Sequence, residues 1–231
     1  GMASQAEKFL YASGKLQVTA YKYEIERNLR TKDYSGFLLL GLNDYSGQGT
    51  ALVGPLNVFW KEKGYVDSKQ WKEFCGKIVP LAKFPKFIFQ NTDTLNIPIE
   101  VYNASEGEIK DADIEYSIID NNTQSNIIAK YNTTIKYGKN NEIRSVTLPL
   151  NGIKAPSKLT LNVSVNGNTN EWDFWVYPSK VEMPKTKDIY ITDTLDSKAI
   201  KILNNGGKVL ITAGGKIRYG NDVKQTYLPV F

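Results

Sequence analysis

The sequence predicts a multidomain chain in which two α/β segments flank an all-β domain, and three observations lead to this prediction. A stripe of apolar residues with helical spacing precedes an unbroken apolar run at Phe37 to Leu42. From about residue 84 the hydrophobic period becomes two, and beyond residue 178 a β-α-β pattern follows. Because a change of period marks a change of element type, these shifts predict domains at residues 1–83, 84–178 and 179–231.

The first thirty residues predict helices over residues 3–13 and 15–30, and Gly14 is expected to break or bend the helical run. Lys22 and Glu26 lie off the apolar stripe of the second helix, so we expect them to be ordinary surface charges. The stripe itself consists of Val18, Tyr21, Ile25 and Leu29.

The run Phe37 to Leu42 has no polar alternation, which predicts a strand buried on both faces, as in a parallel sheet. A polar, glycine-rich loop leaves it at Asn43. Loops at the carboxyl ends of parallel strands often carry substrate-binding residues, so this loop is a candidate site. The alternative is a tight turn whose glycines only permit positive φ. Further on, Asp67 is placed to cap a helix through Trp71.

Residues 84–178 predict an immunoglobulin-like β-sandwich, because seven short strands in about 95 residues are separated by turn signals. Turns are expected at Asn121-Asn122, at Gly138-Lys139-Asn140, at Asn151-Gly152 and at Asn166-Gly167. The expected strands are 86–91, 95–103, 112–119, 127–135, 143–150, 159–165 and 172–177.

The last of these strands is rich in aromatic residues. Alternation places Trp172, Phe174 and Val176 on one face, which we expect to join the core. Trp175 and Tyr177 lie on the other face. They are candidates for a sugar-stacking platform, and the alternative is that they pack against a neighbouring domain.

Beyond a proline-containing linker, strands at 188–192 and 208–212 flank an amphipathic helix at 196–204. This is one β-α-β unit with an expected right-handed crossover. Gly214-Gly215 after the second strand could cradle a phosphate, but the fuller glycine fingerprint and a following helix are absent, so we expect a plain turn.

Composition excludes several classes of function. The chain has no histidine and one cysteine, Cys75, which removes Ser-His and Cys-His catalysis, an internal disulfide and a multi-cysteine zinc site. We therefore expect no metal and no cofactor. The net charge of +5 is spread along the chain, so nucleic-acid binding is not expected. No apolar run reaches the roughly 18 residues that cross a bilayer, so no membrane segment is expected.

Two motifs resemble one known family. Residues 38–54, LLLGLNDYSGQGTALVG, followed by FWKEKGY at 59–65, are similar to the last strand and loop of the catalytic barrel in glycoside hydrolase family 2, the bacterial β-galactosidase and β-glucuronidase group. Residues 171–178, EWDFWVYP, resemble the closing strand of the sandwich that follows that barrel. The resemblance implies that residues 1–83 are the C-terminal remnant of a (β/α)₈ barrel and that residues 179–231 begin a flavodoxin-like module. Gly41 and Ser46 depart from the family pattern, which leaves the fine shape of the pocket open.

The resemblance also implies a function. The parent protein would be a retaining glycosidase acting on terminal glycosides of a polysaccharide, periplasmic or secreted. Its catalytic glutamates lie on earlier barrel strands, so this chain alone should have no catalytic residues and be inactive. Sugar-contacting residues implied by the resemblance are Asn43, Asp44, Tyr45, Gln48 and Trp60.

Three alternatives stay open at this stage. Asp44 could instead cap its loop in an Asx-turn. The chain could be a non-catalytic carbohydrate-binding or scaffold protein that uses the β-sandwich. Incomplete domains could also expose apolar edges through which two copies of the chain would associate.

Overall fold

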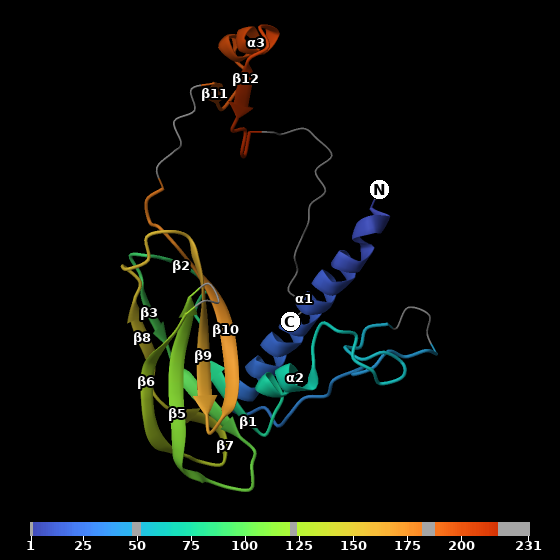
Figure 1. Ribbon diagram of the computed structural model, residues 1–231, viewed down its shortest axis with the longest axis vertical. Coiled ribbons are helices and arrows are strands. Elements are labelled where there is room, and N and C mark those ends of the chain that lie inside the picture. Colours follow the sequence, from blue (N-terminus) through green and yellow to red (C-terminus); the bar gives the residue numbers. More distant parts are fainter. Residues whose placement is uncertain (1, 48–51, 121–123, 182–187, 217–231) are drawn as a thin grey trace. The chain divides into compact units, whose positions relative to one another are not determined.

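The computed structural model describes residues 2–47, 52–120, 124–181 and 188–216. They form a mixed α/β chain that consists mostly of β-sheet with a few helices (Figure 1). The chain divides into two compact units, Gly1–Ser179 and Lys180–Phe231, and each is described by itself. In chain order the helices are η1 (Ala3–Gln5), α1 (Ala6–Arg30), α2 (Ser68–Phe74) and α3 (Ser197–Asn204). The strands are β1 (Ile78–Ala82), β2 (Ile88–Gln90), β3 (Thr94–Ile97), β4 (Ile99–Asn103), β5 (Ile109–Asp120), β6 (Gln124–Ile135), β7 (Gly138–Glu142), β8 (Val146–Pro149), β9 (Ser157–Val165), β10 (Asn168–Tyr177), β11 (Ile189–Thr192) and β12 (Lys208–Ile211).

Helix α1 is continuous over 25 residues, so the expected break at Gly14 is wrong. The aromatic ring of Tyr65 packs directly on Gly14, which is buried. A Cβ atom at this position would lie 2.4 Å from Cδ1 of Tyr65. The glycine therefore serves close packing rather than helix termination, and the energetic cost of one glycine in a helix is only about 1 kcal/mol.

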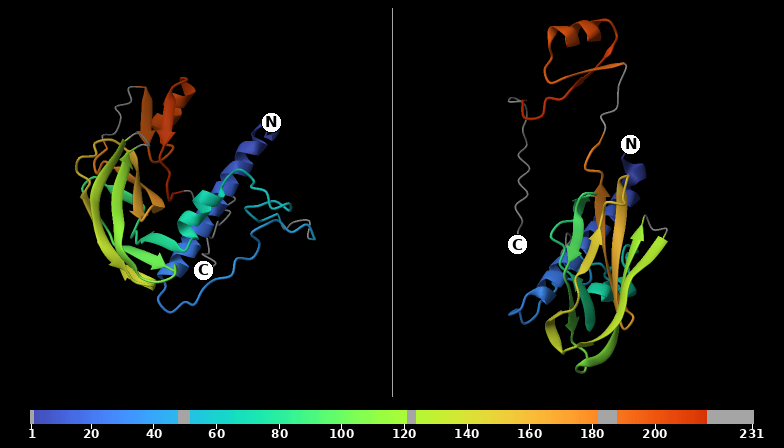
Figure 2. Two further views of the ribbon diagram at one scale, coloured as in Figure 1. Left: turned by 60° about the horizontal axis from the view of Figure 1, so that its bottom comes forward. Right: turned by 90° about the vertical axis from the view of Figure 1, so that its left-hand side faces the viewer.

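The expected buried strand at Phe37 to Leu42 is also wrong. These residues have no strand conformation, and Leu38 and Leu40 are 101% and 94% exposed. A strand buried on both faces needs hydrogen-bonded neighbours and covering layers. Among the described residues, the pairing nearest this stretch is an isolated parallel bridge between Asn43 and Leu56, in which the Leu56 N–H donates to the Leu42 carbonyl. Figures 1 and 2 show α1 lying between the β-sheets and the later described parts of segment 31–67, whereas Lys139 of β7 donates hydrogen bonds to the carbonyls of Thr31 and Tyr34 at the start of the segment.

Helix α2 begins as the sequence predicts. The Asp67 side chain accepts a hydrogen bond from the Gln70 backbone N–H, and the Gln70 side chain accepts one from the Asp67 N–H. This reciprocal capping box satisfies two otherwise unpaired donors at the helix start. The helix then directs Phe74 into a small cluster with Ile25 and Leu29 of α1 and with Val79 and Leu81 of β1.

The sheets of unit 1 form what we call the β region, residues 78–177. One sheet has the strand order β1-β4-β7, and the larger one has β2-β10-β9-β5-β6. A short third sheet pairs β3 with β8. All these pairings are antiparallel except β2 with β10. One hydrophobic cluster is shared by strands of all three sheets, which places the core between them.

Leu95, Ile97, Ile99 and Val101 alternate in the sequence with polar residues, a proline and a tyrosine, which predicts one buried face, and all four are buried. The opposite face was expected to be wetter, and this is wrong at Glu100, which is only 1% exposed. The single predicted strand 95–103 is nevertheless two strands. It is interrupted at Pro98, which lacks an N–H for a sheet ladder, and the chain passes from β3 in one sheet to β4 in another. Trp172, Phe174 and Val176 are buried, as the face assignment predicts.

Two strands were not predicted. The expected turn at Gly138 to Asn140 belongs to β7, which pairs irregularly with β4 because Gly138 and Asn140 have positive φ angles of 105° and 56°. The residues that predicted a turn here instead form a β-bulge in an edge strand. Strand β1 contains Pro80, and a proline within a run normally argues against a strand because it has no N–H for the sheet ladder. The sequence analysis therefore did not predict β1.

Unit 2 contains the expected β-α-β unit. Strands β11 and β12 are parallel, and α3 connects them. Asp196 caps α3 by accepting a hydrogen bond from the Ala199 N–H at 2.7 Å. Lys216, after the Gly214-Gly215 turn, forms an ion pair with Asp193, the residue that follows β11.

Candidate functional site

The loop after Leu42 is organised by two backbone segments that run side by side, residues 42–44 and 54–56. The Asp44 N–H donates to the Leu56 carbonyl at 2.9 Å, and the Leu56 N–H donates to the Leu42 carbonyl at 3.1 Å. Gly54 permits this approach, because a Cβ atom there would lie 2.4 Å from the Asn43 carbonyl carbon. The glycine therefore has a defined packing role in the candidate loop.

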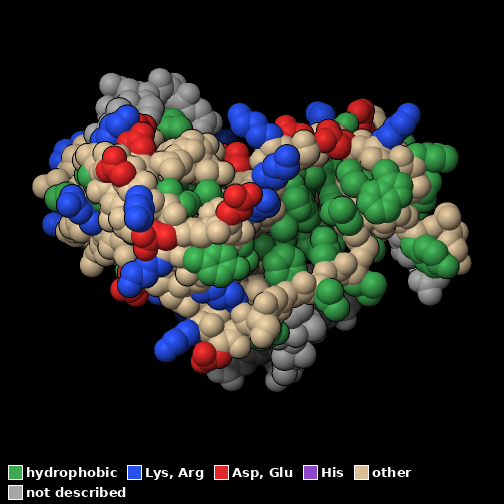
Figure 3. Space-filling view, turned by 90° about the horizontal axis from the view of Figure 1, so that it is seen from below, with side chains coloured by type: hydrophobic (Ala, Val, Ile, Leu, Met, Phe, Trp, Pro, Cys, Tyr) green, Lys and Arg blue, Asp and Glu red, His purple; other side chains and the backbone are tan. Residues whose placement is uncertain are grey.

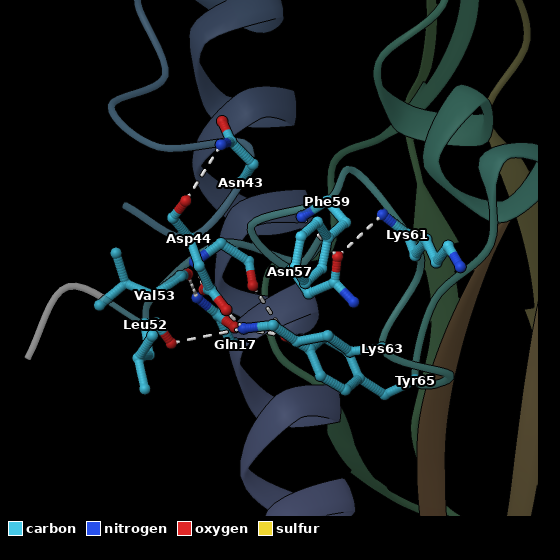
Figure 4. A network of polar contacts seen from close by, with 11 residues as sticks. Gln17, Asn43, Asp44, Leu52, Val53, Asn57, Phe59, Lys61, Lys63 and Tyr65 are labelled. Atoms are coloured by element: carbon cyan, nitrogen blue, oxygen red, sulfur yellow. Dashed lines mark hydrogen bonds and ion pairs between the residues drawn. The ribbon is translucent and has the colours of Figure 1, made fainter. Parts of the chain in front are cut away.

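Asp44 is buried and holds the loop closed (Figure 4). Its Oδ1 accepts hydrogen bonds from the Gly54 N–H at 3.0 Å and from Lys63 Nζ at 2.7 Å. Both partners are distant in sequence, whereas an Asx-turn would use an N–H two residues on. Asp44 thus joins three parts of the chain that are distant in sequence. The sequence analysis expected either a sugar contact or an Asx-turn at Asp44 and did not predict this role.

Tyr65 and Gln17 anchor the same loop to α1. The Tyr65 hydroxyl donates to the Gly54 carbonyl at 3.1 Å and lies 3.3 Å from Gln17 Oε1, while Gln17 Nε2 donates to the Val53 carbonyl. Burial raises the pKa of Tyr65, and the nearby Lys63 ammonium partly offsets that increase. The hydroxyl therefore stays protonated at neutral pH and can act as the donor in this contact.

Trp60 sits at the end of a tight hairpin turn and has an unusual backbone conformation. Its N–H donates to the Asn57 carbonyl at 2.9 Å, and the Asn57 N–H donates to the Lys61 carbonyl at 2.9 Å. This is the three-residue loop in which the last residue is left-handed and is normally glycine. Trp60 has φ 61°, and its side chain is 64% exposed. A bulky residue in a strained, exposed position is a feature of functional sites.

The predicted sugar-contacting residues that the structure describes lie in two segments, residues 43–45 and Trp60. Asn43 and Asp44 are held against residues 54–56, while Tyr45 and Trp60 expose their rings. Gln48 lies outside the described residues. Sequence reasoning missed Lys63 and Tyr65, because a lysine in a Lys-Glu-Lys run and a tyrosine after glycine carry no local signal for a contact with Asp44.

A second concave region of unit 1 is a groove of about 990 Å³ between α1, α2 and β10. Residues of α1 form one wall, and Glu171, Asp173 and Trp175 of β10 form another. Trp175 is 39% exposed, and its backbone N–H donates to the Phe87 carbonyl at 2.8 Å, which brings a second exposed ring to the groove. Tyr177, the other predicted stacking residue, is exposed but does not line the groove.

Glu26 closes the floor of this groove, and its expected role as a surface charge is wrong, since it is only 3% exposed. It accepts hydrogen bonds from Asn170 Nδ2 at 2.8 Å and from Trp172 Nε1 at 2.9 Å. Ion pairs connect it to Lys22 at 2.7 Å and to Arg30 at 3.8 Å. Lys22, also expected at the surface, is partly buried and lies over the Trp172 ring.

The sequence contains a weak signal for the cluster around Glu26, which the sequence analysis did not use. Lys22, Glu26 and Arg30 recur every four residues, so they form one stripe beside the apolar residues Ile25 and Leu29. Such a stripe is normally solvated. Here the indole and amide donors of β10 complete the coordination of Glu26, and no local pattern could have identified them.

Glu73 of α2 also lines the groove, and its carboxyl pKa is raised. The larger cause is burial, and the negative charge of Glu171 adds to it, while Lys22 and Lys69 act in the opposite direction. A raised pKa in a cleft is a feature of binding sites as well as of structural ones. Within the described part of the chain, no group of three or more acidic or cysteine side chains is arranged to hold a metal ion.

None of the described helices combines the length and apolar character needed to span a membrane. The distribution of apolar surface is uneven. Figure 3 shows hydrophobic side chains gathered in a broad patch on one face of the molecule. Large exposed apolar residues are frequent in α1 and in the segment that follows it, and they include Phe9, Leu10, Leu16, Leu38, Leu40, Phe59 and Trp60.

Comparison with known protein families gives one match. Residues 93–178, most of the β region, match a family model described as a domain of unknown function, DUF8488. The match covers less than half of the chain. A sequence search of the curated proteins finds no match.

Solved structures give low-scoring alignments. A mutant β-glucosidase from Listeria innocua in complex with laminaribiose aligns at 11% identity and a TM-score of 0.35, over 64% of this chain and 21% of that one. The sporulation control protein Spo0M from Bacillus subtilis aligns at 11% identity and 0.28, over 44% and 49%. AvmM, described as catalysing macrocyclization in alchivemycin A biosynthesis, aligns at 8% and 0.25, over 47% and 93%. The chain thus spans about a fifth of the β-glucosidase and half of Spo0M, and these alignments carry no functional argument.

Proposed function

We propose that this chain is a non-catalytic portion of a retaining glycoside hydrolase similar to family 2, and that its loop 43–60 forms one wall of the sugar-binding site. The finer fold assignments belong to this proposal. Residues 1–83 would be the end of a (β/α)₈ barrel, residues 84–178 an immunoglobulin-like sandwich, and residues 179–231 the start of a flavodoxin-like module. The parent enzyme would be periplasmic or secreted.

One observation carries the proposal. The run Phe37 to Leu42 has the composition of a strand buried in a parallel sheet, yet Leu38 and Leu40 project into solvent, and hydrogen bonds join residues 42–44 of the chain to residues 54–56. Single exposed apolar residues are ordinary on protein surfaces, but a contiguous apolar run marks an interaction surface. Neighbouring barrel strands would cover this run and would place the polar loop at the carboxyl edge of the sheet.

The chemistry of the loop favours binding over catalysis. Glycoside hydrolysis by retention needs two carboxyl groups about 5–5.5 Å apart on opposite sides of one sugar. Asp44 is the only acidic residue of the loop at residues 43–60, and its Oδ1 is committed to Gly54 and Lys63. The loop can instead offer the Asn43 amide, the clamped Asp44 carboxylate and the exposed Tyr45 and Trp60 rings to a sugar.

An activity assay tests the non-catalytic part of the proposal. The purified chain should show no turnover of p-nitrophenyl β-galactoside or p-nitrophenyl β-glucuronide. Turnover that the Asp44→Asn substitution abolishes would overturn the proposal, because the loop would then itself supply a catalytic carboxyl group.

The gene tests the assignment to a larger enzyme. Reading the coding sequence upstream of codon 2 should reveal an open frame that continues in register into several strands bearing a pair of glutamates. A stop codon or a start signal at that point would contradict the assignment.

The exposed apolar run also bears on self-association. Contiguous exposed apolar surface promotes association between copies, so a second copy of the chain could cover this surface. Light scattering at high concentration would then show a dimer or a larger species, and a monomer would exclude this mode of association.

A second candidate function is carbohydrate binding through the β region, and the position of Trp175 at the groove favours it. Aromatic faces bind the C–H faces of pyranose rings, and the Trp175 ring is held by its strand rather than by a loop. A glycan array should show binding that Trp175→Ala removes. Absence of binding to any glycan would count against this function.

A further inference from the structure

The groove between α1, α2 and β10 has an aromatic wall with a fixed position. Trp175 and Phe87 are joined by a backbone hydrogen bond of 2.8 Å, and Phe84 stacks on Phe87 with ring centroids 5.2 Å apart. Trp175 and Phe87 are each 39% exposed. A ligand would therefore meet rings that are already ordered, which reduces the entropic cost of binding.

Most charges in the groove are already paired. Lys22 and Arg30 form ion pairs with Glu26, Lys83 pairs with the buried Glu100, and Asp173 pairs with Lys158 at 2.8 Å. These residues belong to the structure of the groove and are not available to a ligand without loss of those contacts.

Two carboxylates in the groove are unpaired. Neither Glu73 nor Glu171 has a side-chain hydrogen bond or an ion pair among the described residues. The cations whose charge reaches Glu73 are Lys22, which is committed to Glu26, and Lys69. Lys15 also lines the groove, two helical turns or about 10 Å before Lys22 along α1. Lys22 and Lys69 offset part of the negative charge at the Glu73–Glu171 end of the groove, but among the described residues neither lysine forms an ion pair with these two carboxylates.

The arrangement along β10 sets the length of the ligand. Glu171, Asp173 and Trp175 alternate on the same face of the strand, so Glu171 and Trp175 are about 13 Å apart along it at roughly 3.3 Å per residue. A single small molecule cannot reach both positions. An oligomer can place one ring on Trp175 and a charged group of another ring near Glu171 and Glu73.

We propose that this groove binds an oligosaccharide of amino sugars, with one pyranose ring stacked on Trp175 and a protonated amine near Glu171 and Glu73. The proposal rests on the second candidate function, carbohydrate binding at Trp175, and it adds the substrate class. Charge complementarity supports the amine, because an ammonium group would receive two carboxylates that no described side chain pairs with directly. The stacking wall supports a sugar over a simple diamine.

Calorimetric titration of the whole chain with three tetrasaccharides at neutral pH tests the proposal. The probes are a glucosamine tetramer, its fully N-acetylated form and a β-linked glucose tetramer. The glucosamine tetramer should bind at least tenfold more tightly than the other two. Glu171→Gln and Glu73→Gln should each weaken its binding three- to tenfold, and Trp175→Ala should weaken it at least tenfold.

Matched controls separate local from general effects. Tyr137→Ala and Glu108→Gln change an exposed ring and an exposed carboxylate that do not line the groove, and they should leave the affinity unchanged. Thermal unfolding of every variant shows whether it is folded. If a variant fails to fold, competition between the three tetrasaccharides on the unaltered chain still decides the preference for an amine.

The outcomes distinguish this inference from the function on which it rests. If all three tetrasaccharides bind with equal affinity and Trp175→Ala abolishes that binding, the preference for an amine is overturned, while carbohydrate binding at Trp175 is retained. No binding of any tetrasaccharide would overturn both. Tetralysine that binds as tightly as the glucosamine tetramer, with the same response to the glutamate substitutions, would show that the groove recognises amines of peptides and would overturn the sugar assignment.

Discussion

The β region and segment 31–67 are both rich in apolar residues, yet they use them in opposite ways. In the β region, apolar side chains at every second position face a shared core, and Phe174 and Leu95 are fully buried. In segment 31–67, the apolar run around Leu38 faces solvent. The difference shows that apolar composition leads to burial only when the chain also supplies a partner layer for that face.

The two regions also differ in what holds them in place. The β region has continuous hydrogen-bonded ladders, whereas the loop of segment 31–67 depends on single polar contacts, chiefly those of Asp44 with Gly54 and Lys63. One lost contact should therefore matter more locally in the loop, and one lost side-chain volume should matter more in the β region. The following predictions test this contrast.

The largest expected effect is loss of core volume. Phe174→Ala should lower the free energy of unfolding by about 4 kcal/mol, because it leaves a cavity in the fully buried core. Leu38→Ala should change it by less than about 0.5 kcal/mol, since Leu38 is exposed. Urea unfolding measures both values. Similar losses in the two variants would show that Leu38 is buried in solution and would remove the contrast between the regions.

The next effect concerns the contact between α1 and the β region. Glu26→Ala should lower the free energy of unfolding by about 3 kcal/mol, because it leaves Lys22, Asn170 and the Trp172 indole N–H without their shared acceptor. Glu24→Ala on the same helix removes a glutamate without such partners and serves as the control. A loss below about 1 kcal/mol in Glu26→Ala would mean that the buried cluster does not hold the helix to the sheet.

A gain in stability is expected at the hairpin turn. Trp60→Gly should raise the free energy of unfolding by about 1 kcal/mol, because glycine adopts the left-handed conformation without steric cost. Phe59→Gly, at the neighbouring exposed ring, should give no gain since Phe59 has no positive φ. Under the proposed function, Trp60→Gly would also remove a ring from the sugar site. Equal losses in both variants would show that the Trp60 ring itself stabilises the loop.

The smallest effect is a dependence on pH. Because the folded-state pKa of Glu73 is raised above its ordinary value of 4.5, the folded chain binds this proton more tightly than the unfolded chain does. The resulting stabilisation is complete at low pH and is lost as pH rises through the raised pKa. Glu73→Gln should therefore raise the melting temperature at pH 7 and leave it unchanged at pH 4. The charged groups that act on Glu73 are Glu171, Asp67, Lys22 and Lys69.

The exposed variant Glu108→Gln controls for the change in net charge. A melting temperature that does not respond to Glu73→Gln at either pH would show that Glu73 is fully solvated. The groove would then lack the environment on which the amine-binding inference relies.

Several local features could be predicted from the sequence because each depends on a few adjacent residues. The N-cap at Asp67 needs only an acceptor side chain just before the helix, and the burial of Leu95, Ile97, Ile99 and Val101 agrees with their spacing of two, although Glu100 between them is buried as well. The β-α-β unit of residues 188–212 likewise follows from its period changes and from the helix stop signal at Asn205-Gly206-Gly207. In the candidate loop, sequence reasoning selected Asp44 but not its partners.

What the sequence determined by itself was therefore local: the helical stripe of α1, the alternating strands and the capping residues. The tertiary structure alone decided which charges are buried and which apolar residues are not. Glu26 is buried because β10 brings an indole N–H and an amide to it, and Leu38 is exposed because no described strand pairs with its segment. Both outcomes depend on contacts between residues far apart in the chain. The hydrophobic period predicts on which face of a helix or strand a residue lies, but it does not predict which other element packs against that face.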